Sequence, residues 1–198
     1  MTEYSTTDYT AILGTLLSDG SKLEFNYTNN RQDKVGYPGL TMDIVYSYTD
    51  MYTLKYHRVT PFGMFSTMNV ELFNTDIDHL MDNVILRGNT GNGVMSWPTA
   101  SDTYGGRIIG TIGSDIRAGI DYEHNTKDAE QNMVMSGMNV FMTYLWPGVE
   151  TEKLGLFFEQ DLNNISYGLR YDQVELDPTR AADDPGSGMM QKTANEVY

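Results

Sequence analysis

The sequence predicts an all-β fold of about eight antiparallel strands. One observation is the alternation of apolar and polar residues in short segments, as in Lys22-Leu23-Glu24-Phe25-Asn26-Tyr27-Thr28. Such a segment, when extended, has one apolar and one polar face. A second observation is the recurrence of Gly, Pro, Asp and Asn between the segments, since these residues favour tight turns. The 14 tyrosines and 19 glycines also suit strands and turns better than helices.

Each strand is expected where this alternation holds. The expected strands cover residues 8–17, 21–29, 50–59, 64–75, 103–112, 115–124, 151–160 and 164–175. Short connections join them in pairs at Ser18-Asp19-Gly20, Pro61-Phe62-Gly63, Gly113-Ser114 and Asp161-Leu162-Asn163. Long connections are expected near 30–49, 76–102 and 125–150, followed by a polar tail at 176–198. The whole chain, 1–198, is therefore expected to be a single β-barrel segment without a plug domain.

The regular change from short to long connections favours an antiparallel transmembrane β-barrel, because bacterial outer-membrane barrels have short turns on one side and long loops on the other. Strands of about ten residues also match the roughly 9–11 residues that a tilted strand needs to cross a bilayer. The residues expected to face the lumen are Lys55, His57, Glu71, Arg107, Arg117, Asp121, Lys153, Glu159, Arg170 and Asp172. A soluble antiparallel sheet shows the same alternation, so that alternative stays open.

The net charge and the absence of certain motifs exclude several classes of function. The net charge of −14 disfavours nucleic acid as a partner, because phosphates are bound by Lys and Arg. The absence of cysteine excludes disulfides and thiolate ligands within this chain. The three histidines lie far apart, and no nucleophile, zinc-protease or P-loop motif is present. We therefore expect a protein that is not an enzyme.

A metal site is suggested by His79 and Met81. If Glu71 faces the lumen and the strand continues without a bulge, alternation puts His79 and Met81 on the same face. A thioether selects Cu(I) and an imidazole also suits copper, so Cu(I) is favoured and Cu(II) is possible. A second group, Met133, Met135, Met138 and Met142, could contact the metal or simply fill gaps in apolar packing.

Five segments carry a family resemblance. Tyr37-Pro38-Gly39-Leu40-Thr41-Met42-Asp43, the stretch from Asp78-His79-Leu80-Met81-Asp82-Asn83 to Arg87, and Thr103-Tyr104-Gly105-Gly106-Arg107 resemble TonB-dependent copper receptors. Gly119-Ile120-Asp121-Tyr122 and Gly168-Leu169-Arg170-Tyr171-Asp172 look like later strands of that barrel. The resemblance implies a 22-stranded barrel that holds a plug and is energised through TonB. It also implies a copper site in which a barrel His-x-Met pair, here His79 and Met81, meets a Cys and a Met of the plug.

The function expected from these observations is part of a receptor in the bacterial outer membrane, which binds copper and passes it through a gated barrel. Its expected partners are the copper ion, outer-membrane lipid, the plug and the TonB system. The alternative is a small outer-membrane barrel whose acidic loops have a structural, adhesive or cation-binding role. A copper receptor should prefer Cu(I) to Ca²⁺, whereas an acidic-loop binder should show the reverse preference.

Overall fold

A computed structural model describes residues 4–89, 93–134, 141–162 and 164–178. All eight strands belong to one antiparallel sheet, and each strand pairs with the next in the sequence. In order, they are β1 (Ser5–Leu16), β2 (Lys22–Val35), β3 (Asp43–Arg58), β4 (Phe65–Asp82), β5 (Val94–Ile112), β6 (Ile116–Val134), β7 (Phe141–Leu162) and β8 (Ile165–Asp177). The expected all-β class, strand number and antiparallel order are confirmed.

The strands are longer than expected. They run from 12 residues in β1 to 22 in β7, whereas the alternation predicts about ten. Most of the ranges 30–49, 76–102 and 125–150, expected as loops, are therefore strand, and the prediction of long loops there is wrong. These stretches are rich in polar residues. Asp and Asn have low strand propensity, and a run of polar residues lacks the apolar alternation by which a strand is recognised. Within the described residues, no helix is long and apolar enough to cross a membrane.

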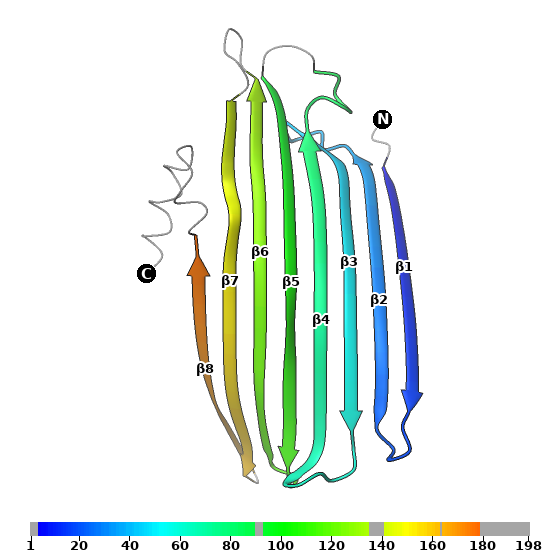
Figure 1. Ribbon diagram of the computed structural model, residues 1–198, viewed down its shortest axis with the longest axis vertical. Helices are drawn as coiled ribbons and strands as arrows, with labels where there is room; N and C mark the ends of the chain where they lie inside the picture. Colours follow the sequence, from blue (N-terminus) through cyan, green and yellow to red (C-terminus); the bar gives the residue numbers. More distant parts are fainter. Residues whose placement is uncertain (1–3, 90–92, 135–140, 163, 179–198) are drawn as a thin grey trace.

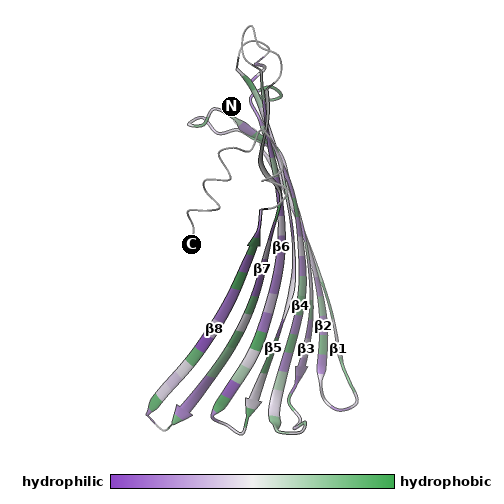
Figure 2. Cartoon of the chain, turned by 60° about the vertical axis from the view of Figure 1, so that its left-hand side comes forward, coloured by the Kyte–Doolittle hydropathy of each residue, from purple (hydrophilic) through white to green (hydrophobic). Residues whose placement is uncertain are grey.

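The sheet forms a single curved layer that does not close (Figures 1 and 2). In the described part of the chain, β1 and β8 are the two edges and do not pair with each other. Of the two arrangements left open for these strands, part of a larger barrel or closure as a small barrel, the described residues do not form the second. The short connections at 17–21, 59–64 and 113–115 lie together at one end, called here the short-turn end, and the connecting residues 36–42 and 83–89 lie at the other (Figure 1).

One side of the sheet, called here the charged face, carries rows of opposite charges. The register places Glu24 opposite Lys55, Lys55 opposite Glu71, Glu71 opposite Arg107, and Arg107 opposite Asp121. Opposite charges directly across two strands attract each other and stabilise the pairing. The ten residues expected to face the lumen all have the strand phase of this face, as expected from the alternation.

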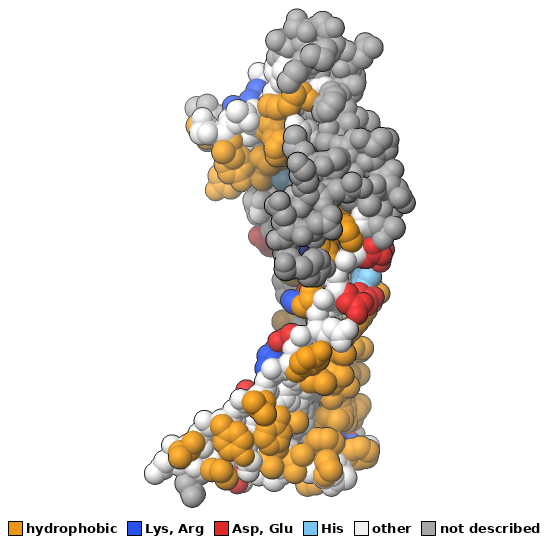
Figure 3. Space-filling model, turned by 90° about the vertical axis from the view of Figure 1, so that its left-hand side faces the viewer, with side chains coloured by type: hydrophobic (Ala, Val, Ile, Leu, Met, Phe, Trp, Pro, Cys, Tyr) orange, Lys and Arg blue, Asp and Glu red, His pale blue; other side chains and the backbone are white. Residues whose placement is uncertain are grey.

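The other side, called here the apolar face, carries large hydrophobic side chains toward the short-turn end (Figure 3). Phe25, Leu54 and Leu72 are neighbours in one row across three strands, and these side chains are 38%, 38% and 51% exposed. Among the described residues, only Met42 and Ala129 are buried hydrophobics. A soluble protein buries such side chains in a core, so this sheet needs an apolar environment on this face.

Tyrosines lie on the apolar face where its large hydrophobic side chains end, on the side away from the short-turn end. Tyr27 stacks on Tyr52, with ring centroids 5.0 Å apart, and Tyr104 lies 6.5 Å from Tyr122. Rings with one polar end are typical of the boundary between hydrocarbon and headgroups. One row further from the short turns, the same face carries a line of carboxylates, Asp50, Asp76 and Asp102, directly opposite one another.

Candidate metal site

His79 and Met81 lie near the end of β4, on the charged face. β4 pairs with β5 without a break from Thr67 to Asp82, so the strand phase of Glu71 carries through to Met81. A register shift occurs on the other side of β4, between Ile44 and Tyr46, but the extra residue belongs to β3. Two residues in one strand with the same phase project on the same side of the sheet. The structure therefore brings an imidazole and a thioether together as the sequence predicts.

The environment of His79 favours its metal-binding form. Its Nδ1 lies 3.1 Å from Oγ1 of Thr99 on β5. Partial burial lowers the pKa of His79, and the nearby Asp78 carboxylate opposes this shift more weakly. A neutral imidazole is the form that binds metals, and a hydrogen bond at one ring nitrogen orients the other toward a ligand. The contact with Thr99 thus makes Nε2 the ring nitrogen that would bind a metal ion.

Two further methionines share this part of the charged face. Met81 is directly opposite Trp97 on β5, and Met95 has the same phase as Trp97 two residues earlier in β5. Met95 is in turn directly opposite Met133 on β6. Directly opposite side chains have Cβ atoms about 4.5–5.5 Å apart, and diagonal neighbours about 7–8 Å. The register therefore places Met81, Met95 and Met133 of three neighbouring strands on the charged face, toward the end of the sheet beyond His79.

Met95 is a residue that the sequence analysis missed. It lies in the range 76–102, where a loop was expected, so no strand phase was assigned to it. Its one signal in the sequence is that it lies two residues before Trp97, the spacing at which apolar residues of a strand share a face. Only the pairing of β4 with β5 brings it next to Met81.

The methionines of the second predicted group, at positions 133, 135, 138 and 142, do not all lie in the same part of the structure. Met133 joins the cluster through its pairing with Met95. Met142 lies in β7 opposite Asn132 of β6, so the backbone places it next to the same end of the sheet. Met135 and Met138 lie outside the described residues.

Hard-metal ligands do not gather in the described residues. They contain no group of three or more His, Cys, Asp or Glu side chains that could hold a metal ion. The clustered donors are instead one imidazole and several thioethers. Since soft sulfur donors select soft ions, this arrangement suits Cu(I) better than Ca²⁺ or Mg²⁺.

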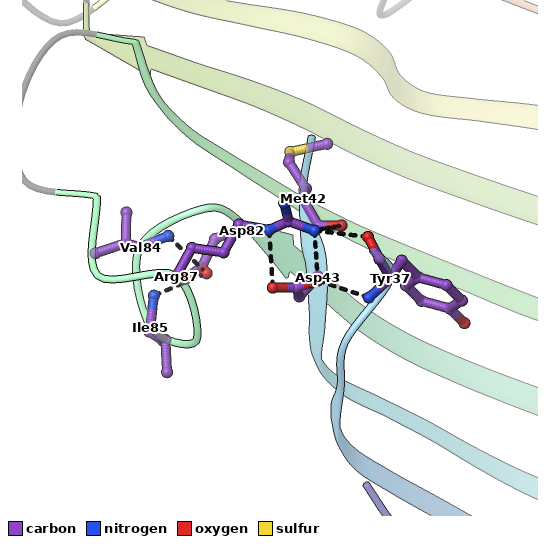
Figure 4. Close-up of polar contacts among 7 residues, drawn as sticks. All are labelled: Tyr37, Met42, Asp43, Asp82, Val84, Ile85 and Arg87. Carbon is purple, nitrogen blue, oxygen red and sulfur yellow. Dashed lines mark hydrogen bonds and ion pairs between the residues drawn. The ribbon is translucent and has the colours of Figure 1, made fainter. Parts of the chain in front are cut away.

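The chain directly after Met81 is held by its own side chains. Oδ1 of Asp82 accepts hydrogen bonds from the backbone N–H groups of Val84 and Ile85, both at 3.0 Å (Figure 4). Oδ1 of Asn83 accepts one from the N–H of Met95 at 2.9 Å, and its Nδ2 donates to the carbonyl of Gly93 at 2.8 Å. These bonds connect the end of β4 to the start of β5, next to both Met81 and Met95.

Comparison with known proteins supports the fold. No protein-family model matches this sequence, and no curated protein matches it. Among solved structures, the chain is similar to the copper transporter OprC, with a TM-score of 0.72 and 18% sequence identity over 87% of this chain. The match covers 30% of the OprC chain, so this chain spans less than a third of that protein. At this identity the similarity shows the fold, which is that of a β-barrel wall.

Proposed function

We propose that this chain forms part of the wall of an outer-membrane barrel that takes up copper, with His79 and Met81 as metal ligands. The observation that carries the proposal is the shared phase of His79 and Met81 on the charged face, with Met95 and Met133 on the adjoining strands. The fold similarity to a copper transporter supports the same reading. The role is binding and transport of the ion, with no catalytic step.

The two faces support a place in the outer membrane. The apolar face, bounded by tyrosines, offers the band of hydrocarbon contact that a membrane-spanning wall needs. The charged face would then line the lumen. Since the sheet is open in the described residues, we propose that further strands complete the barrel, and that a plug in its lumen supplies the remaining copper ligands, with energy from TonB.

The test is a copper titration of the full chain in detergent under reducing conditions. We expect Cu(I) to bind to the wild type, and binding to weaken at least tenfold in a His79→Ala/Met81→Ala double variant, because two of its ligands are lost. A matched control is His57→Ala/Met51→Ala, which removes the same residue types from β3 on the same face. Equal affinity of all three proteins for Cu(I) would overturn the site.

The alternative role as an acidic cation-binding barrel would rest on the row Asp50, Asp76 and Asp102 on the apolar face. However, Asp50 is paired with Arg31 at 2.5 Å, and the described residues hold no group of three carboxylates that could bind a metal ion. Carboxylates are ligands of Ca²⁺. Titration with Ca²⁺ in the same buffer separates the two functions. Preference for Ca²⁺ over Cu(I), lost in Asp76→Asn but kept in the His79→Ala/Met81→Ala variant, would favour the alternative.

A further inference from the structure

Arg87 ties the connection after β4 to the connection before β3. Its Nε donates to Oδ2 of Asp43 at 2.8 Å, and its Nη2 donates to Oδ1 of Asp43 at 2.7 Å. The same Nη2 donates to the carbonyl of Tyr37 at 2.8 Å and lies 3.4 Å from that of Met42 (Figure 4). Oδ1 of Asp43 also accepts the backbone N–H of Tyr37 at 2.7 Å. We call this set of bonds the Asp43–Arg87 clasp.

The clasp resolves an electrostatic conflict in the sheet. Asp43 and Asp82 are directly opposite each other in the β3–β4 ladder, and they are only 5% and 4% exposed. Like charges directly across two strands destabilise the pairing, and a buried charge is costly unless it is paired. Arg87 neutralises Asp43, whereas Asp82 is satisfied by backbone N–H groups. Without Arg87, this end of the β3–β4 pairing would contain an uncompensated buried carboxylate.

The next pair of the same ladder contains Met81. Ile44 is opposite Met81, one position from the Asp43–Asp82 pair, and the register then shifts between Ile44 and Tyr46. A bulge weakens the ladder on this side of β4, whereas on the other side β4 stays paired with β5 through Asp82. The position of Met81 relative to β3 therefore depends on what holds the ends of β3 and β4 together. The bidentate ion pair of the clasp supplies that link, with the geometric specificity of a two-bond arginine–carboxylate contact.

We propose that Asp43 and Arg87 are positioning residues for the copper site: they hold the end of β4 so that Met81 and His79 can bind the same ion. This inference rests on the proposed function. Neither residue is a ligand, because the carboxylate of Asp43 is occupied by Arg87 and by the N–H of Tyr37. The clasp joins two segments that lie far apart in the sequence, and both are segments in which the sequence resembles copper receptors.

The experiment compares Cu(I) binding and X-ray absorption at the copper edge for the full chain in detergent. Arg87→Ala is expected to weaken Cu(I) affinity about tenfold, as for residues that orient metal ligands, and to lower the sulfur contribution relative to nitrogen as Met81 leaves the ion. Arg87→Lys retains the charge but cannot make both bonds to Asp43 at once, so it should restore only part of the affinity and of the sulfur signal. The matched control is Arg117→Ala, which breaks the 3.0 Å pair with Glu159 near the short-turn end and should change neither.

Two results would overturn the proposal. One is wild-type affinity and an unchanged sulfur signal in Arg87→Ala while His79→Ala/Met81→Ala loses binding, which would leave the copper site standing without its positioning residues. The other is a loss of β-sheet circular dichroism in Arg87→Ala that Arg87→Lys does not repair, since the clasp would then serve folding alone. If His79→Ala/Met81→Ala itself binds normally, it is the proposed function that fails.

Discussion

Arg170 on β8 reaches across β7 to form an ion pair with Asp121 on β6. Its Nη2 lies 3.0 Å from Oδ1 of Asp121, and its Nη1 lies 3.1 Å from Oδ2. The pair passes over Gly155, which is opposite Asp121 in the β6–β7 ladder. A Cβ atom at position 155 would lie 2.5 Å from Nη2 of Arg170 and 2.7 Å from Oδ1 of Asp121. The missing side chain of Gly155 therefore lets one ion pair link three strands.

Glycines of the charged face should differ in their tolerance of alanine. In Gly155→Ala, the new methyl group meets only the ends of flexible side chains, so we expect a loss of about 1 kcal/mol or less, as for an exposed ion pair. In Gly105→Ala, it would collide with the backbone carbonyl of Tyr122 and lie 2.7 Å from the Phe73 ring. Overpacking of this kind costs about 1–3 kcal/mol. Urea unfolding of both variants tests the difference, and equal losses would contradict it.

The sequence predicts the part of the fold in which apolar residues alternate. Leu54 and Leu72 identify the halves of β3 and β4 nearer the short-turn end and the face that they share. The structure has strands at these positions, with Leu54 opposite Leu72. The halves of β4 and β5 farther from the short-turn end contain residues such as Asp76 and Asp102, which have no apolar alternation. Their strand structure comes from the neighbouring strands, which supply backbone hydrogen bonds whatever the side chains are.

The candidate site, like the fold, follows from the sequence only where alternation within one strand determines it. The phase of Glu71 leads along one strand to His79 and Met81, so a local rule finds both. The neighbours Met95 and Trp97 depend on the register between β4 and β5, which long-range pairing determines and local alternation does not. The Asp43–Arg87 clasp joins residues 44 positions apart and has no local signature at all.

The clasp should make stability depend on pH in the acid range. The Arg87 guanidinium, followed by the N–H of Tyr37, holds the pKa of Asp43 below its ordinary value. A lowered folded-state pKa contributes stability above the unfolded pKa of about 3.9, and this stability is lost as the pH falls through the folded pKa. The urea midpoint of the wild type should therefore exceed that of Asp43→Asn at pH 7, and the two should begin to converge only as the pH falls below about 3.9, toward the lowered folded-state pKa. A constant difference from pH 7 to pH 3 would contradict this assignment.

Trp97 should report metal binding by its fluorescence. It lies directly opposite Met81, and its buried indole N–H has no hydrogen-bond partner in the described structure. An ion bound at Met81 should quench Trp97, so addition of Ag(I), a soft analogue of Cu(I), should lower the emission. Trp97→Phe removes no hydrogen bond and should abolish most of the response, whereas Trp146→Phe on β7 should keep it. A full response in Trp97→Phe would place the ion elsewhere.

Lipid contact is tested by introducing a charge on each face of the sheet. Leu72 is 51% exposed on the apolar face, and in a bilayer a lysine there should cost about 2–4 kcal/mol near the midplane and less toward the interfaces. Thr53 lies on the charged face, opposite Phe73, and Thr53→Lys should cost no more than about 0.5 kcal/mol. The measurement is the urea dependence of folding of each full chain into phosphatidylcholine vesicles. If Leu72→Lys folds as well as Thr53→Lys, the apolar face does not contact lipid, and another protein surface must cover it.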